Sequence, residues 1–370
     1  MPEKSLRIAL VGAGTLLGKA LNDELAGSVF ASADFHLIDD DDALGKLAAT
    51  ADEVTFIQRI EPDSFDGCDF TFFAGSAELT RAHWRQALKA GSSIVDLSGE
   101  LEGAPGILVR APWVQDDPTV SETAGQSATP VNITKVSAPD LHTRAVVSAH
   151  PVAVLLALLS ARSQRAAPLR GLWTTLLQPA SEYGHAALEE LHQQTTNLLS
   201  FQPLPTEVFG GQTAFALAVS FGAEGNVPLA KASDVIRRHF AKIFPIEQAA
   251  LALQLIQTPI FHGYALSIAL EFAQPVTAEV FTRALKGPHL RIVSDANKFP
   301  GNVQAVEEEE VQVLVRPIFE NLEASASESG RQKTQRFWLW IVADNLRFAA
   351  QNAIACAVEL NRLRPRGSVQ

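Results

Sequence analysis

The chain opens with a strand, a glycine-rich turn and a helix in immediate succession, and this order limits the folds available to it. Arg7 to Val11 is a short apolar run with β-branched residues, which predicts a buried strand. Gly12-Ala13-Gly14-Thr15-Leu16-Leu17-Gly18 comes next, and Lys19 to Leu25 has the amphipathic pattern of a helix. Such a segment opens a dinucleotide-binding βαβ unit, where amides at the helix N-terminus meet a pyrophosphate. A glycine turn that only lets the helix pack on the sheet is the alternative.

Strands and helices continue to alternate through the first half of the chain. We expect further buried strands at Phe35–Ile38, Asp69–Phe73 and Ser92–Ser98, and a helix at Arg81–Ala90. Alternation of this kind implies a parallel sheet covered by helices on both faces. The fold class is therefore α/β, with a Rossmann-type domain over residues 1–150.

The pattern of expected strands and helices changes beyond Pro151. This proline follows a strand at Val146 and Val147 and precedes a helix expected from Val152 to Ala161. Longer strands with antiparallel character are expected at 171–177, 263–272 and 311–317, and helices at 186–199, 229–242 and 277–285. Residues 307–310 and 325–335 are expected to be exposed connections, and residues 344–363 a final helix. We expect an α+β second domain over residues 151–343.

Composition narrows the class of protein. The 370 residues suffice for two domains, and a net charge of -11 argues against general nucleic-acid binding. Two cysteines, Cys68 and Cys356, make neither a disulfide framework nor a zinc site, which suits a reducing cytoplasm. No signal peptide and no stretch long enough to span a bilayer are seen. We expect a cytoplasmic protein that holds no metal and contacts neither membrane nor nucleic acid.

Seven segments resemble, in order, those of the aspartate-semialdehyde dehydrogenase family. They are the glycine turn at Gly12, Ala74-Gly75-Ser76, Ile94–Ser98, Gln178 with Ser181 and Gly184, Gln212–Phe215, Gln257–Ile260 with Gly263, and Trp340–Arg347. The resemblance implies that Gln212–Phe215 is a strand and that Trp340–Arg347 is the signature of the C-terminal helix. It also implies that this helix returns to the first domain and that the second domains pair into a homodimer through their sheet faces. The family is an NAD(P)-dependent oxidoreductase of amino-acid biosynthesis.

The departures from the family pattern fall on its reactive residues. Ser148-Ala149-His150-Pro151 resembles the nucleophile turn, but Ala153 stands where the family keeps its cysteine. Tyr264 stands at the position of the general-base His. Gln257 replaces the Arg that holds the substrate carboxylate, and Glu102 replaces the Arg that binds phosphate. Gln178 alone is retained from this polar set.

These replacements close the family's covalent route. An alanine forms no thioester, and a tyrosine with a pKa near its ordinary value of about 10 is a poor base at neutral pH. Neither Gln nor Glu reproduces the bidentate grip of an Arg on a carboxylate or phosphate. The chain resembles the USG-1-like subgroup, which lacks the catalytic cysteine, and we expect it to lack aspartate-semialdehyde dehydrogenase activity.

Two other functions remain open. The first is an active NAD-dependent oxidoreductase of another substrate, which transfers hydride without a covalent intermediate and uses His185, His150 or Tyr264 as its acid. The second is an interaction protein that pairs with an active paralogue through the dimerisation face. The two cysteines are expected to be inert buried residues in either case.

The resemblance places a dinucleotide on the first domain. The residues it assigns are Gly12, Gly14, Thr15, Leu16, Gly18, Asp39, Ala74 and Gly75. Asp39 or Asp40, at the end of the second strand, suits a ribose diol and would repel the 2′-phosphate of NADP, which favours NAD. The run from Asp39 to Asp42 also fits a solvated acidic loop that binds nothing.

Overall fold

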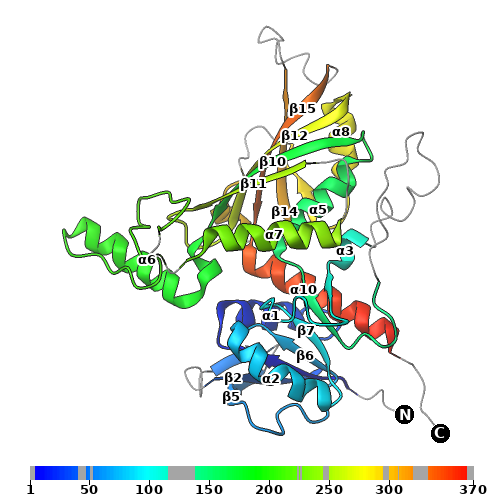
Figure 1. Ribbon diagram of the computed structural model, residues 1–370, viewed down its shortest axis with the longest axis vertical. Helices are drawn as coiled ribbons and strands as arrows, with labels where there is room; N and C mark the ends of the chain where they lie inside the picture. Colours follow the sequence, from blue (N-terminus) through cyan, green and yellow to red (C-terminus); the bar gives the residue numbers. More distant parts are fainter. Residues whose placement is uncertain are drawn as a thin grey trace. The chain divides into compact units, whose positions relative to one another are not determined.

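The computed structural model describes residues 5–40, 47–50, 53–115, 138–222, 225, 227–244, 250–294, 300–306, 308–319 and 332–364. The chain forms two compact units, whose elements are labelled in Figure 1. Unit 1 comprises residues 1–115, 135–151 and 346–370, and unit 2 comprises residues 116–134 and 152–345. Among the helices of these described residues, none combines the length and the apolar character needed to cross a membrane.

Unit 1 is built on a seven-stranded sheet with the order β5-β2-β1-β6-β7-β9-β8, in which every pairing is parallel. Its strands are β1 (Arg7–Val11), β2 (Asp34–Asp39), β5 (Gln58–Arg59), β6 (Phe70–Phe73), β7 (Ser93–Asp96), β8 (Leu108–Arg110) and β9 (Ala145–Ser148), and β3 (Leu47–Thr50) and β4 (Glu53–Phe56) form a separate hairpin. The predicted parallel sheet is confirmed. Because β1 lies between β2 and β6, the strand order reverses there, and sheets of this kind bind ligands at that point.

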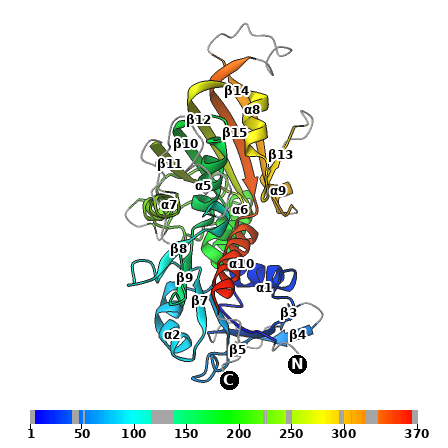
Figure 2. The ribbon, with the colours of Figure 1, turned by 90° about the vertical axis from the view of Figure 1, so that its right-hand side faces the viewer.

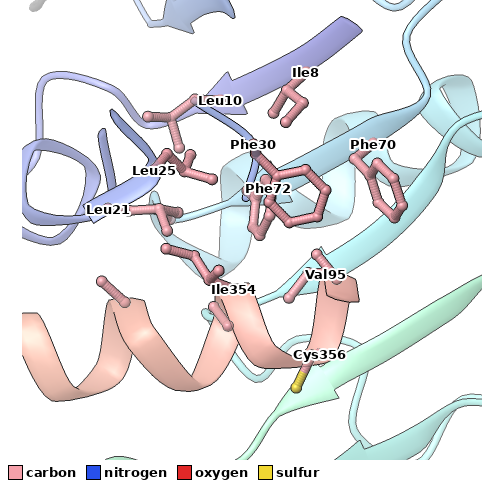
Figure 3. Close-up of a cluster of buried hydrophobic side chains, with 14 of the residues drawn as sticks. Ile8, Leu10, Leu21, Leu25, Phe30, Phe70, Phe72, Val95, Ile354 and Cys356 are labelled. Carbon is pink, nitrogen blue, oxygen red and sulfur yellow. The ribbon is translucent and has the colours of Figure 1, made fainter. Parts of the chain in front are cut away.

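Helices cover both faces of this sheet (Figure 2). They are α1 (Leu16–Ala26), α2 (Ala77–Lys89) and α10 (Asn345–Leu363), with the short α3 (Pro112–Gln115). Phe72 of β6 belongs to the buried cluster that contains residues of α1 and α10 (Figure 3). Its neighbour Phe73 points to the other face and stacks on Phe65, which packs near His83 of α2. Successive residues of one strand therefore supply two separate cores.

The last helix, α10, is an integral part of unit 1, as predicted. Arg110, whose side chain is 3% exposed, forms an ion pair with Glu359, and its Nε lies 2.9 Å from Glu359 Oε2. Asn352 Nδ2 donates to Ser148 Oγ at 2.8 Å. Because removing one partner would leave a buried charge uncompensated, the Arg110–Glu359 pair fixes the position of the helix on the sheet.

Unit 2 is built on a six-stranded mixed sheet with the order β11-β10-β12-β15-β14-β13. Its strands are β10 (Leu169–Gln178), β11 (Ala250–Gln257), β12 (Tyr264–Thr277), β13 (Leu290–Ile292), β14 (Val311–Ile318) and β15 (Lys333–Ala343). The three central pairings are antiparallel, and the two edge strands, β11 and β13, pair in parallel with their neighbours. The predicted α+β character is confirmed.

The helices of unit 2 are α5 (Pro151–Ser163), α6 (Gly184–Leu199), α7 (Leu229–Ile243), α8 (Ala278–Leu285) and α9 (Asn302–Ala305), with a 3₁₀ turn at Ala180–Tyr183. Phe281 of α8 packs on Phe337 and Phe272 of the sheet, with ring centroids 4.8 and 5.0 Å apart. Arg162 at the end of α5 donates to the carbonyl oxygen of Pro288 at 2.7 Å. These contacts bury one face of the sheet.

One predicted strand is wrong. Gln212–Phe215 does not join a sheet but forms a turn, in which the Ala216 N–H donates to the Thr213 carbonyl oxygen at 3.1 Å. The Thr213 and Ala214 amides donate to Gln194 Oε1 of α6 at 2.7 and 3.1 Å. The Gln194 side chain therefore accepts the hydrogen bonds that these two amides would otherwise donate to a neighbouring strand.

One boundary near the end of the chain also differs from expectation. Residues 333–335, assigned to an exposed connection, begin β15, and the rest of that connection lies outside the described residues except for residue 332. The final helix expected over residues 344–363 is confirmed as α10, Asn345–Leu363, and Trp340 to Ala343 of the family segment end β15. The family segment therefore spans a strand end and a helix start.

Candidate functional site

The glycine turn of unit 1 is held by its own backbone and by one threonine. Gly12 has a φ of +83°, a left-handed conformation that glycine adopts at little cost. Thr15 is the N-cap of α1, since its Oγ1 accepts the Gly18 N–H at 2.9 Å. The Thr15 hydroxyl also lies 2.8 Å from the Gly12 carbonyl oxygen. The apolar pattern predicted a helix from Lys19. Because of this cap, α1 begins earlier, at Leu16.

Two glycines of this turn are required by packing. A Cβ added to Gly12 would lie 2.4 Å from the backbone nitrogen of Gly75, and one added to Gly18 would lie 2.0 Å from the Gly12 carbonyl oxygen. Ala74, next to Gly75, is buried at 4% exposure. These glycines would therefore be needed with or without a nucleotide, and they do not by themselves identify a binding site.

Asp39, at the end of β2, lies against the same turn. Its Oδ2 accepts the Gly14 N–H at 2.7 Å, and its Oδ1 accepts the Asp40 N–H at 2.9 Å. Asp39 is 4% exposed, whereas Asp40 is exposed. The interpretation of a solvated acidic loop is therefore wrong for Asp39, and residues 41 and 42 lie outside the described residues.

The donors and acceptors at this corner fit a dinucleotide. The amides of Leu16 and Leu17 begin α1, where a helix leaves its first N–H groups without intrahelical acceptors and favours an anion. The Asp39 carboxylate stands at the strand end where folds of this type meet a ribose diol. A nicotinamide dinucleotide, when bound, supplies a ring that accepts or gives up hydride.

In unit 2, the position assigned to the nucleophile is a buried methyl group. Ala153 is the third residue of α5 and is 0% exposed. Both cysteines, Cys68 and Cys356, belong to unit 1 and are buried, as predicted. Burial raises the pKa of Cys68 to about 11 and also raises the pKa of Cys356. Both sulfurs are therefore thiols at neutral pH, and a thiol is a weak nucleophile.

Tyr264, at the position assigned to the general base, donates its hydroxyl to a carboxylate. Its Oη lies 2.6 Å from Glu182 Oε2, and Asn345 Nδ2 lies 3.4 Å from the same oxygen. Asn345 Oδ1 accepts the Gly263 N–H at 3.1 Å and the Ser181 hydroxyl at 3.2 Å. Burial, and next the charge of Glu182, raise the pKa of Tyr264 well above its ordinary value. The phenol keeps its proton at neutral pH and is not a base.

Gln257, at the position assigned to the carboxylate clamp, is turned toward the backbone. It is 0% exposed, and its Nε2 donates to the carbonyl oxygens of Gln178 and Thr258, each at 3.2 Å. The Thr258 hydroxyl donates to the same Gln178 oxygen at 2.9 Å. With both amide hydrogens engaged, Gln257 has neither a positive charge nor a spare donor for a ligand's carboxylate.

Three of the assigned positions lie together where β10 and β11 end and β12 begins, and we call this part of the unit 2 sheet the strand edge. Gln178 ends β10 and pairs directly with Gln257, which ends β11. Tyr264 begins β12, the next strand, which runs antiparallel to β10. Glu102 belongs instead to unit 1, where it is half-buried and its N–H donates to the Gly99 carbonyl oxygen at 3.1 Å.

The two histidines proposed as acids do not join this edge through any hydrogen bond described for Tyr264. His150 follows β9 in unit 1 and is half-buried, and His185 is exposed in the first turn of α6. Sequence reasoning missed Glu182, the residue that holds Tyr264. Glu182 lies inside the family-like run that includes Gln178, Ser181 and Gly184.

Comparisons with known proteins agree with this geometry. The family model described as "Semialdehyde dehydrogenase, NAD binding domain" matches residues 7–140. The USG-1 protein homolog of Pseudomonas aeruginosa is 30% identical over 358 residues, which cover 94% of this chain and 96% of that protein. The aspartate-semialdehyde dehydrogenase of Synechocystis sp. is 23% identical over 356 residues, or 95% of this chain and 96% of the relative.

A solved structure extends the likeness over both units. The probable aspartate-semialdehyde dehydrogenase from Pseudomonas aeruginosa superposes with a TM-score of 0.74 at 28% identity. The match covers 97% of this chain and 99% of that one. The α/β unit and the mixed-sheet unit therefore both have counterparts in a protein of known structure.

Proposed function

Since the chain belongs to the semialdehyde dehydrogenase family, we propose that it retains a nucleotide-binding unit but does not oxidise aspartate semialdehyde. The observation that carries this proposal is the hydrogen bond from Tyr264 Oη to Glu182 Oε2, 2.6 Å long. It commits the phenolic proton to a neighbouring carboxylate at the position where the family's base would receive a proton. Ala153 and Gln257, both fully buried, support the same conclusion.

Each chemical demand of the family's covalent reaction goes unmet at these positions. A thiolate must attack the aldehyde, a base must take up a proton, and cations must hold the carboxylate and the phosphate. Ala153 offers a methyl group, Tyr264 a protonated phenol and Gln257 an amide whose hydrogens are engaged. Because residues that act as a unit fail together, restoring one of them restores little of the rate.

The proposed ligand of unit 1 is NAD rather than NADP. The family model that matches this unit is one for an NAD-binding domain, which supports the class of ligand. The preference for NAD is supported by the Asp39 carboxylate beside the glycine turn, because an acid at this strand end accepts a ribose diol and repels a 2′-phosphate.

An assay of the full chain with aspartate semialdehyde, inorganic phosphate and either NAD or NADP tests the loss of activity. We expect no reduced nucleotide above a buffer blank, with an active aspartate-semialdehyde dehydrogenase run in parallel as the positive control. Turnover that disappears in Tyr264→Phe would overturn the proposal. It would favour instead an oxidoreductase in which Tyr264 acts as the acid.

We also infer that the chain forms a homodimer through the open face of the unit 2 sheet. Trp173 and Trp338 are 47% and 48% exposed there and lie in one row across Ala269. A cavity of about 450 Å³ on this sheet is lined by Trp338, Trp340 and Arg316, among others. Large half-exposed aromatics on one face are typical of an interface.

Sedimentation of the wild type and of Trp338→Asp tests this assembly. We expect a dimer for the wild type and a shift to monomer for the variant, because a charge in an apolar interface is costly. A wild type that sediments as a monomer at micromolar concentration would contradict it. Pairing with an active paralogue stays a prediction, to be tested by co-purification.

A further inference from the structure

The side-chain amide of Gln257 has a fixed orientation in the interior of unit 2. Its Nε2 lies 3.2 Å from the carbonyl oxygens of both Gln178 and Thr258. Because an oxygen in that place would face two other acceptors, these contacts determine which end of the amide is the nitrogen. The Oε1 atom therefore points away from both carbonyl groups. It is buried, and it accepts no hydrogen bond from the part of the chain that the structure describes.

A second buried glutamine of unit 2 shows how such a side chain is ordinarily satisfied. Gln194 Oε1 accepts the Thr213 and Ala214 amides at 2.7 and 3.1 Å, and its Nε2 donates to the carbonyl oxygen of Pro205 at 2.7 Å. Both ends of that amide are used. Since buried acceptors nearly always find a donor, Gln257 Oε1 needs an explanation that Gln194 does not.

The segment that pairs with Gln257 holds another buried polar atom of this kind. Ala218 and Gln257 exchange two backbone hydrogen bonds, at 3.0 and 2.8 Å. Earlier in the same segment, the buried Thr213 hydroxyl has no hydrogen-bond partner among the described residues. The Ala216 N–H donates to the Thr213 carbonyl oxygen at 3.1 Å, so this part of the backbone is held in place. A hydroxyl can both donate and accept, which suits a polar ligand.

The other polar side chains at the strand edge are neutral or negative. Gln178, which pairs directly with Gln257, is buried and points to the same face of the sheet. The Tyr183 hydroxyl interacts with the Gln178 side chain. The Glu182 carboxylate accepts the Tyr264 hydroxyl at 2.6 Å. These groups favour a ligand that donates hydrogen bonds over one that carries a negative charge.

We propose that Gln257 Oε1 accepts a hydrogen bond from the primary carboxamide of a small ligand. This inference rests on the proposed function, because it takes the strand edge as the counterpart of the family's reactive site. A carboxamide is neutral and enters a buried place at a lower cost than an ammonium ion. A carboxylate has no hydrogen to donate, and its oxygens would meet the lone pairs of Gln257 Oε1. The strand edge therefore selects the amide of a small polar molecule over the acid.

Ligand-observed NMR titration of the full chain with aspartate and with its α-amide tests the proposal. The two probes differ in whether a carboxylate or a carboxamide occupies the α-position. We expect the wild type to bind the α-amide at least about tenfold more tightly, because a site that accepts an N–H group rejects an analogue that lacks it. Gln257→Met keeps a side chain of similar length without the amide and should reduce this ratio by about tenfold.

Thr174→Val is the matched control. The Thr174 hydroxyl is also buried without a hydrogen-bond partner among the residues that the structure describes, but it lies farther along β10 from the strand edge. Its removal should change the ratio of the two affinities by less than about threefold, since distant sites act independently. An equal change in Thr174→Val and Gln257→Met would contradict the proposal.

A crystal of the wild type soaked with the α-amide gives a second test, which needs no variant and decides the question if Gln257→Met does not fold. We expect the carboxamide nitrogen within about 3.2 Å of Gln257 Oε1. An α-amide that binds elsewhere, or that turns another group toward Gln257, would contradict the proposal.

Three results of the titration would also overturn it. They are a wild type that binds aspartate as tightly as the α-amide, an unchanged ratio in Gln257→Met, and no binding of either probe up to about 10 mM. Each of these leaves the proposed loss of aspartate semialdehyde oxidation intact. Turnover of aspartate semialdehyde would instead contradict the proposed function, so the two failures are distinguishable.

Discussion

The glycine turn of unit 1 and the strand edge of unit 2 correspond to the nucleotide site and the reactive site of the family. The two sites are built from different chemical groups. The turn consists of backbone amides, and the side chains it needs are those of Thr15 and Asp39. The edge consists of side chains, namely those of Gln257, Tyr264 and Glu182. A site made of backbone persists as long as the fold does, whereas a site made of side chains can be replaced residue by residue.

The replacements in unit 2 are not vacancies. Tyr264 bonds to Glu182, and Gln257 bonds to the backbone of Gln178, so each new side chain has a hydrogen-bonding partner. These bonds satisfy the Tyr264 hydroxyl and the amide hydrogens of Gln257, whereas Gln257 Oε1 is buried without a hydrogen-bond partner among the described residues. The two regions therefore predict opposite responses to mutation.

The largest effect is expected at the turn. Gly12→Ala combines a φ of +83° with a Cβ 2.4 Å from the backbone of Gly75, and together strain and overpacking should cost roughly 3 kcal/mol of unfolding free energy. Gly106→Ala is the matched control, since Gly106 has a φ of +77° and no atom within 4 Å of the added Cβ. It should cost about 1 kcal/mol. Denaturant unfolding measures both, and equal losses would contradict the packing account.

A smaller effect is expected at the strand edge. Tyr264→Phe removes the hydroxyl that donates to Glu182 and should lower the unfolding free energy by about 2 kcal/mol, because a bond to a charged group is lost. Tyr183→Phe is the matched control, because the Tyr183 hydroxyl interacts with the neutral side chain of Gln178. It should cost less than Tyr264→Phe, about 1 kcal/mol or below. A coupling energy near zero between Tyr264→Phe and Glu182→Gln would contradict the pairing.

The same pair predicts how the protein responds to alkali. Tyr183 and Tyr264 are the chain's two tyrosines, and burial, then the charge of Glu182, raise the pKa of both. The folded protein keeps these protons where the unfolded chain releases them, near pH 10. The contribution of the two tyrosines to stability should thus be constant below about pH 10 and fall as the pH rises further. Tyrosinate absorbance checks this, and ionisation of both tyrosines near pH 10 in the folded protein would contradict it.

The smallest effect is expected from restoring the nucleophile alone. Ala153→Cys should leave aspartate semialdehyde oxidation at the buffer blank, since Tyr264 and Gln257 still supply neither a base nor a cation. Reduced-nucleotide absorbance measures the rate. Turnover in this single variant would show that the edge retains more of the reaction than its hydrogen bonds indicate.

Much of the fold could be predicted because its signals are local. The apolar runs of β1, β2 and β6 and the periodic pattern of α10 are readable within a few residues. Gln212–Phe215 could not be read this way. Its backbone amides donate to the side chain of Gln194, which is 19 residues before Thr213. A segment that resembled a strand therefore forms a turn.

The site was predictable in its losses but not in its new contacts. Ala153, Tyr264 and Gln257 could be assigned by resemblance alone. The role of Glu182 depends on Tyr264, 82 residues later in the chain, and no local pattern joins them. Likewise, the burial of Asp39 distinguishes it from Asp40, although the two are identical in sequence terms.

The separate fates of the two regions can be tested in one measurement. Energy transfer from tryptophan to bound NADH is followed as the full chain is mixed with NADH and then with the acyl phosphate of aspartate. We expect a saturable fluorescence signal from bound NADH that stays constant after the acyl phosphate is added. A signal that decays as NADH is consumed would show that unit 2 retains the chemistry, and the absence of any signal would show that unit 1 has lost the nucleotide.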